Sequence, residues 1–247
     1  DDDRGQEIIT TVDGGFAIVG SSKSNDGDVS ENSGSSDFWV LKVNDLGNIE
    51  WERSFGYLGI DNGLSVLQTQ DQGFLISGVL DVTSSNGEGN SNRLGSPRHA
   101  GGDYWILKLN EMGVLQWSRL FGGTYTDTPH AINETQDGDF IIIGSSDSID
   151  LDISNSKGSY DYWVLKLSGA GDLIWEKSLG GSEIDEAKAM APAIDGDFLI
   201  VGDSRSQDSD VSTNYGAADV WIIRINSDGE LLWEKSFGGS NFDGVQG

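Results

Sequence analysis

Residues Gly158–Gly181 read GSYDYWVLKLSGAGDLIWEKSLGG, and this stretch decides the fold. It contains two runs with the composition of β-strands, a glycine turn between them and two tryptophans. Close variants recur at Gly34–Gly56, Gly101–Gly123 and Gly216–Gly239, and all 8 tryptophans of the chain lie in these copies, two in each. A chain with such self-similarity is a repeat protein, so each copy marks one structural unit.

One complete unit, starting at Asp185, predicts four strands that follow one another in antiparallel order. Residues 185–194 are rich in small side chains, as expected for a crowded inner strand, and residues 198–202 form a short apolar strand. Residues 219–226 and 230–237 are the third and fourth strands. Four such units predict an all-β fold, a β-propeller with four blades of four antiparallel strands. A larger or open ring is the alternative for a chain that is a fragment.

The spacing of the repeats also predicts the domain organisation, a single propeller domain over residues 1–247. We expect the blades at residues 1–56, 57–123, 124–181 and 182–239. The tail, residues 240–247, is expected to overlap or close the first blade, because residues 243–247 align in phase with residues 3–7 at the start of an inner strand.

Composition limits the classes of partner. The chain has 247 residues, with 15 Lys and Arg against 41 Asp and Glu, which gives a formal net charge of −26. Such an acidic surface repels nucleic acids and anionic membranes. Apolar runs are too short to cross a bilayer, so we expect no membrane insertion. There is no cysteine, which excludes disulfides and thiol chemistry. We expect a monomeric domain or a part of a longer chain.

The loop between the second and third strands carries an acidic pattern in three of the units. Chain direction places this loop on the same face as the link that enters each inner strand. Carboxylates at positions i and i+2 with a hydroxyl at i+4 are oxygen ligands of the kind that Ca²⁺ takes in flexible loops. The predicted metal ligands are Asp26, Asp28, Ser30, Asp150, Asp152, Ser154, Asp208, Asp210 and Ser212. The alternative is that these side chains cap turns within polar loops, and the sequence leaves both interpretations open.

The equivalent loop of the second unit differs from the others. Residues 80–102 are eight residues longer and lack the acidic pair, and they carry Arg93, Arg98 and His99 instead. Because loops on a rigid scaffold often carry function, these three residues are candidates for binding a ligand. A tolerated insertion is the alternative.

The recurring tryptophans favour packing between blades over a role as exposed sugar platforms, because they lie in the middle of strands. A symmetric glycine turn in each hairpin predicts a cation opposite the first tryptophan of each copy. The predicted pairs are Trp39 with Arg53, Trp105 with Arg119, Trp163 with Lys177 and Trp221 with Lys235.

The inventory for catalysis is small. The two histidines, His99 and His130, do not recur in the repeats, and neither lies in a nucleophile or metal signature. Carboxylate pairs on the loop face could serve glycoside hydrolysis, but repeats rich in Asp produce such pairs by default. The sequence therefore favours a protein without catalytic activity.

The consensus of the repeat is GGSxxDxAxxxxxTxDGGFxIxGxSxSxDxDVSxxxGxxDYWVLKLxxxGxLxWEKSxGG. It resembles the tandem propeller repeats of secreted and surface proteins from Bacteroidetes-type bacteria, which are often cargo of type IX secretion. The resemblance covers essentially the whole chain. It implies an extracellular or cell-surface location but no particular activity. The chain opens with three aspartates and no signal peptide, as a processed secreted protein would.

Together these observations predict an extracellular, non-catalytic binding or adhesion module. Its ligand would be a glycan or a protein surface, and Ca²⁺ would organise its acidic loop face. The alternatives are a carbohydrate-active enzyme, such as a glycoside hydrolase or a lyase, and a structural spacer within a larger surface protein.

Overall fold

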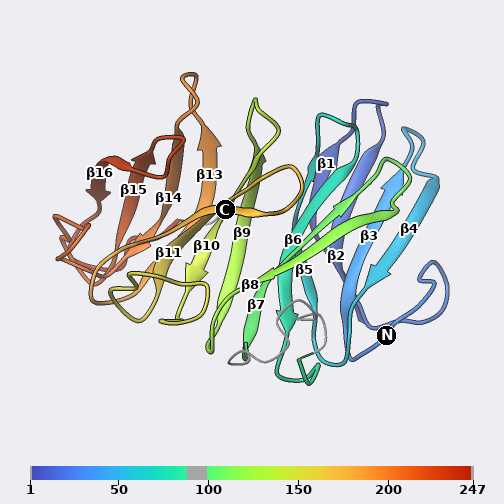
Figure 1. Ribbon diagram of the computed structural model, residues 1–247, viewed down its shortest axis with the longest axis horizontal. Coiled ribbons are helices and arrows are strands. Elements are labelled where there is room, and N and C mark those ends of the chain that lie inside the picture. The colour runs from blue at the N-terminus through green and yellow to red at the C-terminus, as the bar shows by residue number, and fades with distance from the viewer. Residues whose placement is uncertain (1, 88–98, 246–247) are drawn as a thin grey trace. The chain divides into compact units, whose positions relative to one another are not determined.

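The computed structural model describes residues 2–87 and 99–245 (Figure 1). In these residues the secondary structure consists of strands, and none of it is a helix that could cross a membrane. The first sheet contains β1 (Asp3–Thr10), β2 (Phe16–Ser22), β3 (Asp37–Val43) and β4 (Ile49–Phe55). The second contains β5 (Asn62–Gln68), β6 (Phe74–Asp81), β7 (Gly102–Leu109) and β8 (Leu115–Phe121). The third contains β9 (Asp127–Glu134), β10 (Phe140–Ser146), β11 (Asp161–Leu167) and β12 (Leu173–Leu179). The fourth contains β13 (Asp185–Pro192), β14 (Phe198–Ser204), β15 (Asp219–Ile225) and β16 (Leu231–Phe237).

Each sheet follows the order of the chain, with every strand antiparallel to the next. This is the arrangement of a propeller blade, and the four sheets are therefore called blades 1 to 4 in chain order. The predicted fold class, an all-β protein of four-stranded antiparallel blades, is confirmed. Two compact units divide the chain. Asp1–Phe121 contains blades 1 and 2, and Gly122–Gly247 contains blades 3 and 4.

Each unit has its own hydrophobic core, which lies between its two blades. In the first unit the Phe38 and Trp105 rings meet edge to face with centroids 4.8 Å apart. In the second unit Tyr162 and Trp221 hold equivalent places at 4.7 Å, and both are completely buried. The prediction that these tryptophans pack between blades is thus confirmed for Trp105 and Trp221. Contacts of this size stabilise the packed blades mainly by removing apolar area from water.

The predicted register of the third and fourth strands was wrong by one residue. Trp39 lies opposite Ser54, and Arg53 lies opposite Val40, because the register shifts between Lys42 and Val43. The same shift occurs in the other blades, so the three remaining predicted tryptophan–cation pairs are wrong as well. The cause is the turn, in which Gly47 has a φ of 78° and the strands meet through a β-bulge. Arg53 instead lies over the ring of Trp51 in its own strand, at 5.8 Å.

The innermost strand of each blade also contains a bulge. In blade 1 Gly5 and Glu7 pair with adjacent residues of β2, and Gln6 between them is skipped. The skipped residues in the other blades are Leu64, His130 and Lys188. A glycine of the second strand makes room for the bulge, because a Cβ on Gly20 would lie 1.8 Å from the carbonyl oxygen of Arg4. Bulges redirect side chains, and this one sets the position of the candidate site.

Candidate functional site on the inner strands

The inner-strand bulges are where the repeat changes its chemistry from blade to blade. An aspartate stands at the entry to every inner strand, and the four-residue sequences are Asp3-Arg-Gly-Gln6, Asp61-Asn-Gly-Leu64, Asp127-Thr-Pro-His130 and Asp185-Glu-Ala-Lys188. The first of the four positions is an aspartate in each blade, whereas the residues at the second and fourth positions differ in charge and polarity from blade to blade. Variation on a constant framework is the pattern that a binding surface shows.

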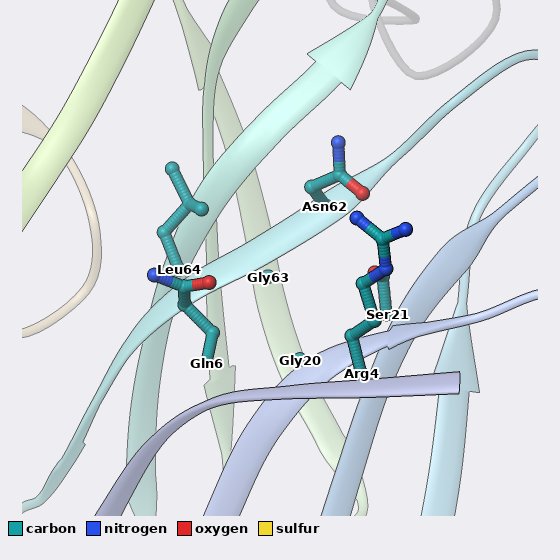
Figure 2. Close-up of a pocket in the computed structure, with 7 residues that line it drawn as sticks. All are labelled: Arg4, Gln6, Gly20, Ser21, Asn62, Gly63 and Leu64. Carbon is teal, nitrogen blue, oxygen red and sulfur yellow. The ribbon is translucent and has the colours of Figure 1, made fainter. Parts of the chain in front are cut away.

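In the first unit these residues line one cavity of about 210 Å³. Its wall is made by Arg4, Gln6, Gly20, Ser21, Asn62, Gly63 and Leu64. Figure 2 shows the side chains of Arg4 and Gln6 rising from β1 and those of Asn62 and Leu64 from β5. The cavity thus brings together two amides, a guanidinium and one apolar side chain from two adjacent blades.

A second, smaller cavity of about 160 Å³ shares Arg4, Ser21 and Asn62 with the first and adds Asp2 and Lys23. The Arg4 guanidinium lies 2.6 Å from Oδ2 of Asp2, and Lys23 Nζ lies 4.0 Å from the same oxygen. The hydrogen bond with Asp2 raises the pKa of Arg4 further above its ordinary value. Two cations therefore flank one end of the site on a chain whose net charge is −26.

In the second unit the equivalent positions hold Thr128 and His130 on β9 and Glu186 and Lys188 on β13. Lys188 Nζ lies 3.3 Å from Oε2 of Glu186. The pKa of His130 is lowered to about 4, mainly by burial and to a smaller extent by the Lys188 charge, with Glu186 acting in the opposite direction. The imidazole is therefore neutral at physiological pH, with one nitrogen that donates and one that accepts a hydrogen bond. This unit thus offers a different set of polar groups at the same framework positions.

In blade 3, the predicted metal ligands Asp150 and Asp152 accept hydrogen bonds from the segment that links β8 to β9. Asp150 Oδ1 accepts hydrogen bonds from the backbone nitrogen of Thr124, at 3.0 Å, and from its hydroxyl. Asp152 Oδ2 accepts one from the backbone nitrogen of Gly122, at 3.2 Å. Ser154 donates to Glu176, which also accepts from the Trp163 indole. The prediction that loop and link share a face is confirmed.

Blade 4 repeats these contacts. Asp208 Oδ1 accepts from the backbone nitrogen of Ser182 at 2.7 Å, and Asp210 Oδ2 accepts from that of Gly180 at 3.1 Å. Ser212 donates to Glu234 at 2.5 Å. The contacts of Asp208 and Asp210 match the turn-capping interpretation, in which the carboxylates satisfy backbone donors that would otherwise be left unpaired.

In blade 1 the equivalent residues Asp26, Asp28 and Ser30 are exposed. Within the described ranges the Asp26 and Asp28 side chains have no hydrogen bond, although the backbone carbonyl of Asp26 closes a turn with Val29. No group of three or more His, Cys, Asp or Glu side chains among the described residues could hold a metal ion. The nine predicted ligands are therefore distributed over three separate loops, and Ca²⁺ binding stays a prediction.

Of the three predicted ligand-binding residues in the long loop of blade 2, only His99 is described. Arg93 and Arg98 lie outside the described residues. His99 is buried, and its Nδ1 contacts Oδ2 of Asp103, also buried, at the start of β7. In blades 1, 3 and 4 a backbone nitrogen four residues before the equivalent aspartate makes this contact. The His99 ring thus occupies a structural position within the blade.

Sequence reasoning missed the bulge residues, although a signal was present. Gln6, Leu64, His130 and Lys188 stand at one position of the repeat and share no chemistry. A position that varies in this way is invisible in the repeat consensus, and the sequence pointed to none of the four as a binding residue.

Comparison with known proteins adds distant likenesses. No protein-family model matches the chain. The chain is 27% identical over 180 residues to the regulatory protein FlaEY of Caulobacter vibrioides, a match that covers 68% of this chain and 19% of that protein. The chain thus spans about a fifth of the length of this curated relative. Among solved structures, a protein of unknown function from Bacteroides caccae is similar with a TM-score of 0.49 and 13% identity. That match covers 98% of this chain and 72% of the other.

Proposed function

We propose that the protein is a non-catalytic binding module of the extracellular space or cell surface, and that its ligand contacts the inner-strand bulge residues. One observation carries the proposal. The four blades share one framework but present four different side chains at the bulge position. In the first unit, Gln6 and Leu64 at this position line a polar cavity of about 210 Å³. If the protein were a purely structural spacer, there would be no reason for the bulge position to carry a different side chain in each blade.

The chemistry of the first unit's cavity indicates the class of ligand. Asn62 and Gln6 each offer a donor and an acceptor, and the Arg4 guanidinium offers a planar pair of donors that fits a carboxylate. Leu64 adds an apolar contact suited to the face of a sugar ring or an aliphatic chain. We therefore propose a glycan that carries an acidic group, with the carboxylate at Arg4 in place of Asp2.

Location and route of export rest on the resemblance of the repeats and on composition. An acidic surface would keep a secreted domain soluble, and the repeat consensus resembles that of type IX secretion cargo. The chain would then act as one binding domain of a surface protein.

The test is a screen of neutral and acidic glycans against the wild-type chain, followed by affinity measurements on variants. We expect Arg4→Ala to weaken the acidic ligand at least tenfold, because it removes a charge-assisted pair of hydrogen bonds. We expect Gln6→Ala and Asn62→Ala to weaken neutral and acidic ligands alike. Lys177→Ala is the matched control, since it removes an exposed cation from an outer strand.

Two outcomes would contradict the proposal. If the Arg4→Ala and Gln6→Ala variants bind every glycan found in the screen as tightly as the wild type does, the binding site lies elsewhere. Turnover of a glycan, seen as release of reducing ends, would support the carbohydrate-active enzyme that the sequence left as an alternative.

A further inference from the structure

Within each unit, two aspartates that lie side by side in the interior join the first blade to the second. One begins the third strand of a blade, and the other lies at the entry to the inner strand of the following blade, as the residue before β5 or as the first residue of β13. Parallel β-bridges join the residues just before them, Ser36 with Ile60 in the first unit and Tyr160 with Ile184 in the second. The backbone therefore places Asp37 beside Asp61 and Asp161 beside Asp185. All four are at most 1% exposed.

The hydrogen bonds of the second-unit pair are divided unequally between its two carboxylates. Asp185 Oδ2 accepts from the backbone nitrogen of Gly181 at 2.6 Å and from the Ser206 hydroxyl at 2.8 Å, and its Oδ1 accepts from the Ser204 hydroxyl. Asp161 Oδ2 accepts from the backbone nitrogen of Lys157 at 2.6 Å. Among the described residues Asp161 Oδ1 has no hydrogen-bond partner, although it is buried. A buried carboxylate oxygen in this state is costly.

The glycine at the end of the preceding strand shows where this oxygen points. A Cβ on Gly180 would meet Asp161 Oδ1 at 2.4 Å and Asp185 Oδ2 at 2.7 Å, so both oxygens face the same small space. The equivalent space at Gly238 is faced by Asp219 Oδ1 and Asp243 Oδ2. The motif is therefore a property of the repeat.

We propose that the buried pairs Asp37–Asp61 and Asp161–Asp185 each bind one proton at neutral pH, and that in the second pair Asp161 is the acid, with its proton on Oδ1 facing the Asp185 carboxylate. The proton satisfies the one buried oxygen without a partner and reduces the charge of the pair from two to one. Asp185 is the carboxylate because three neutral donors stabilise its charge, whereas Asp161 has the backbone nitrogen of Lys157 and, with a smaller effect on its pKa, the Ser156 hydroxyl.

The surroundings favour the proton over a metal ion. Ca²⁺ takes six to eight oxygens, whereas the donors on Asp185 leave few lone pairs for a cation. The charged and titratable groups nearby are Lys157, Glu186, Asp203, Asp208, Asp210 and the Tyr162 hydroxyl. Lys157 lowers the pKa of Asp161, but it pairs with Asp210 at 2.8 Å, and burial dominates, so the pKa values of Asp161 and Asp185 are both raised.

The first unit agrees. Burial is the main cause that raises the pKa of Asp37 and raises that of Asp61 to about 7, and the charges of Asp37 and Asp81 add to the shift of Asp61. Glu31 acts on Asp37 in the same direction. Folded pKa values above those of the unfolded chain mean that the folded state holds the extra proton. This stability is complete below about pH 4 and is lost as the pH rises through about 7.

The experiment measures the unfolding equilibrium of the whole chain between pH 5 and 8.5 for four proteins. The shared protons should make stability fall with rising pH up to about pH 7, by up to tenfold in the unfolding constant per pH unit for each proton held, while His130 acts in the opposite direction below pH 6.5. In Asp161→Asn the dependence of stability on pH should be weaker, by the contribution of up to one proton. The reason is that the asparagine amide donates the same hydrogen bond at every pH. Asp185→Asn should be less stable at all pH values, since its amide would face the donors of Gly181, Ser204 and Ser206. Asp228→Asn, an exposed turn residue, controls for the lost charge and should keep the wild-type slope.

Nuclear magnetic resonance of chain labelled with ¹³C at the Asp carboxyl carbons gives a readout that does not depend on a variant folding. We expect carboxyl resonances that stay in the protonated position at pH 6, where exposed aspartates have ionised. The absence of any such resonance would overturn the proposal. A wild-type slope in Asp161→Asn would also overturn it. A Ca²⁺-dependent rise in the melting temperature that Asp161→Asn removes would show a metal site in place of the proton.

Discussion

Asp210 Oδ2 lies 2.8 Å from Nζ of Lys157, and the ion pair joins the long loops of blades 3 and 4. Both side chains are about a quarter exposed. Asp210 also accepts a hydrogen bond from the backbone nitrogen of Gly180, and Lys157 donates to the carbonyl of Ser178. A residue that the sequence suggested as a Ca²⁺ ligand is thus part of a contact between blades.

The first prediction concerns the strength of this contact. In a double-mutant cycle with Lys157→Met and Asp210→Asn, we expect a coupling free energy of about 0.5–1 kcal/mol, because the pair is partly exposed. Chemical denaturation of the four proteins measures it, and the coupling should shrink at high salt. A coupling of zero at low salt would contradict a stabilising role.

The second prediction uses two equivalent loop residues with different contacts. Asp208→Ala should lower the free energy of unfolding by about 1 kcal/mol, because it leaves the Ser182 backbone donor without its acceptor. Asp26→Ala, at the same repeat position in blade 1, removes an exposed side chain without a hydrogen bond in the described ranges and should be nearly neutral. Equal losses from both variants would show that the capping contact contributes little.

The third prediction addresses Ca²⁺. Because Asp150, Asp152, Asp208 and Asp210 already accept backbone hydrogen bonds, the turn-capping interpretation predicts the same midpoint for melts in excess EDTA and in millimolar Ca²⁺. An upward shift would instead reveal an ion that binds the folded state. Asp26→Asn combined with Asp28→Asn then tells whether the exposed loop of blade 1 holds it.

The fourth prediction follows from the burial of His130. The pKa of His130 is lowered to about 4, below its unfolded value near 6.5, so the unfolded state binds more protons between these values. Its contribution to stability is present above pH 6.5 and is lost as the pH falls towards 4. His130→Gln should therefore remove about 1–2 kcal/mol of acid destabilisation between pH 7.5 and 4.5. An unchanged profile would contradict a buried neutral imidazole.

The fifth prediction tests the link between the inner-strand bulge and its glycine. Gly20→Ala should cost about 1–3 kcal/mol, since the new Cβ would lie 1.8 Å from the Arg4 carbonyl oxygen and the backbone would have to move. Gly5→Ala is the matched control, because its Cβ would make only an ordinary contact of 3.8 Å with Ile18. Thermal unfolding of both variants gives the comparison, and equal effects would exclude steric coupling.

The repeats predicted the strands well and their register poorly. A period in the sequence shows where strands begin, because apolar runs and glycine turns recur with it. It does not show a β-bulge, which changes the pairing by one residue and moved Trp39 from Arg53 to Ser54. His99 illustrates the same limit for single residues, since nothing in its loop indicates the buried contact with Asp103.

The sequence by itself determined the number of blades, their antiparallel order and the acidic character of the surface, because these depend on local composition and its repetition. The tertiary structure alone decided which side chains meet. It joined Asp161 to Asp185 and brought Arg4 and Gln6 to Asn62 and Leu64, residues far apart in the chain. The physical reason is that such contacts form only when bulged strands and parallel bridges place neighbouring blades against each other.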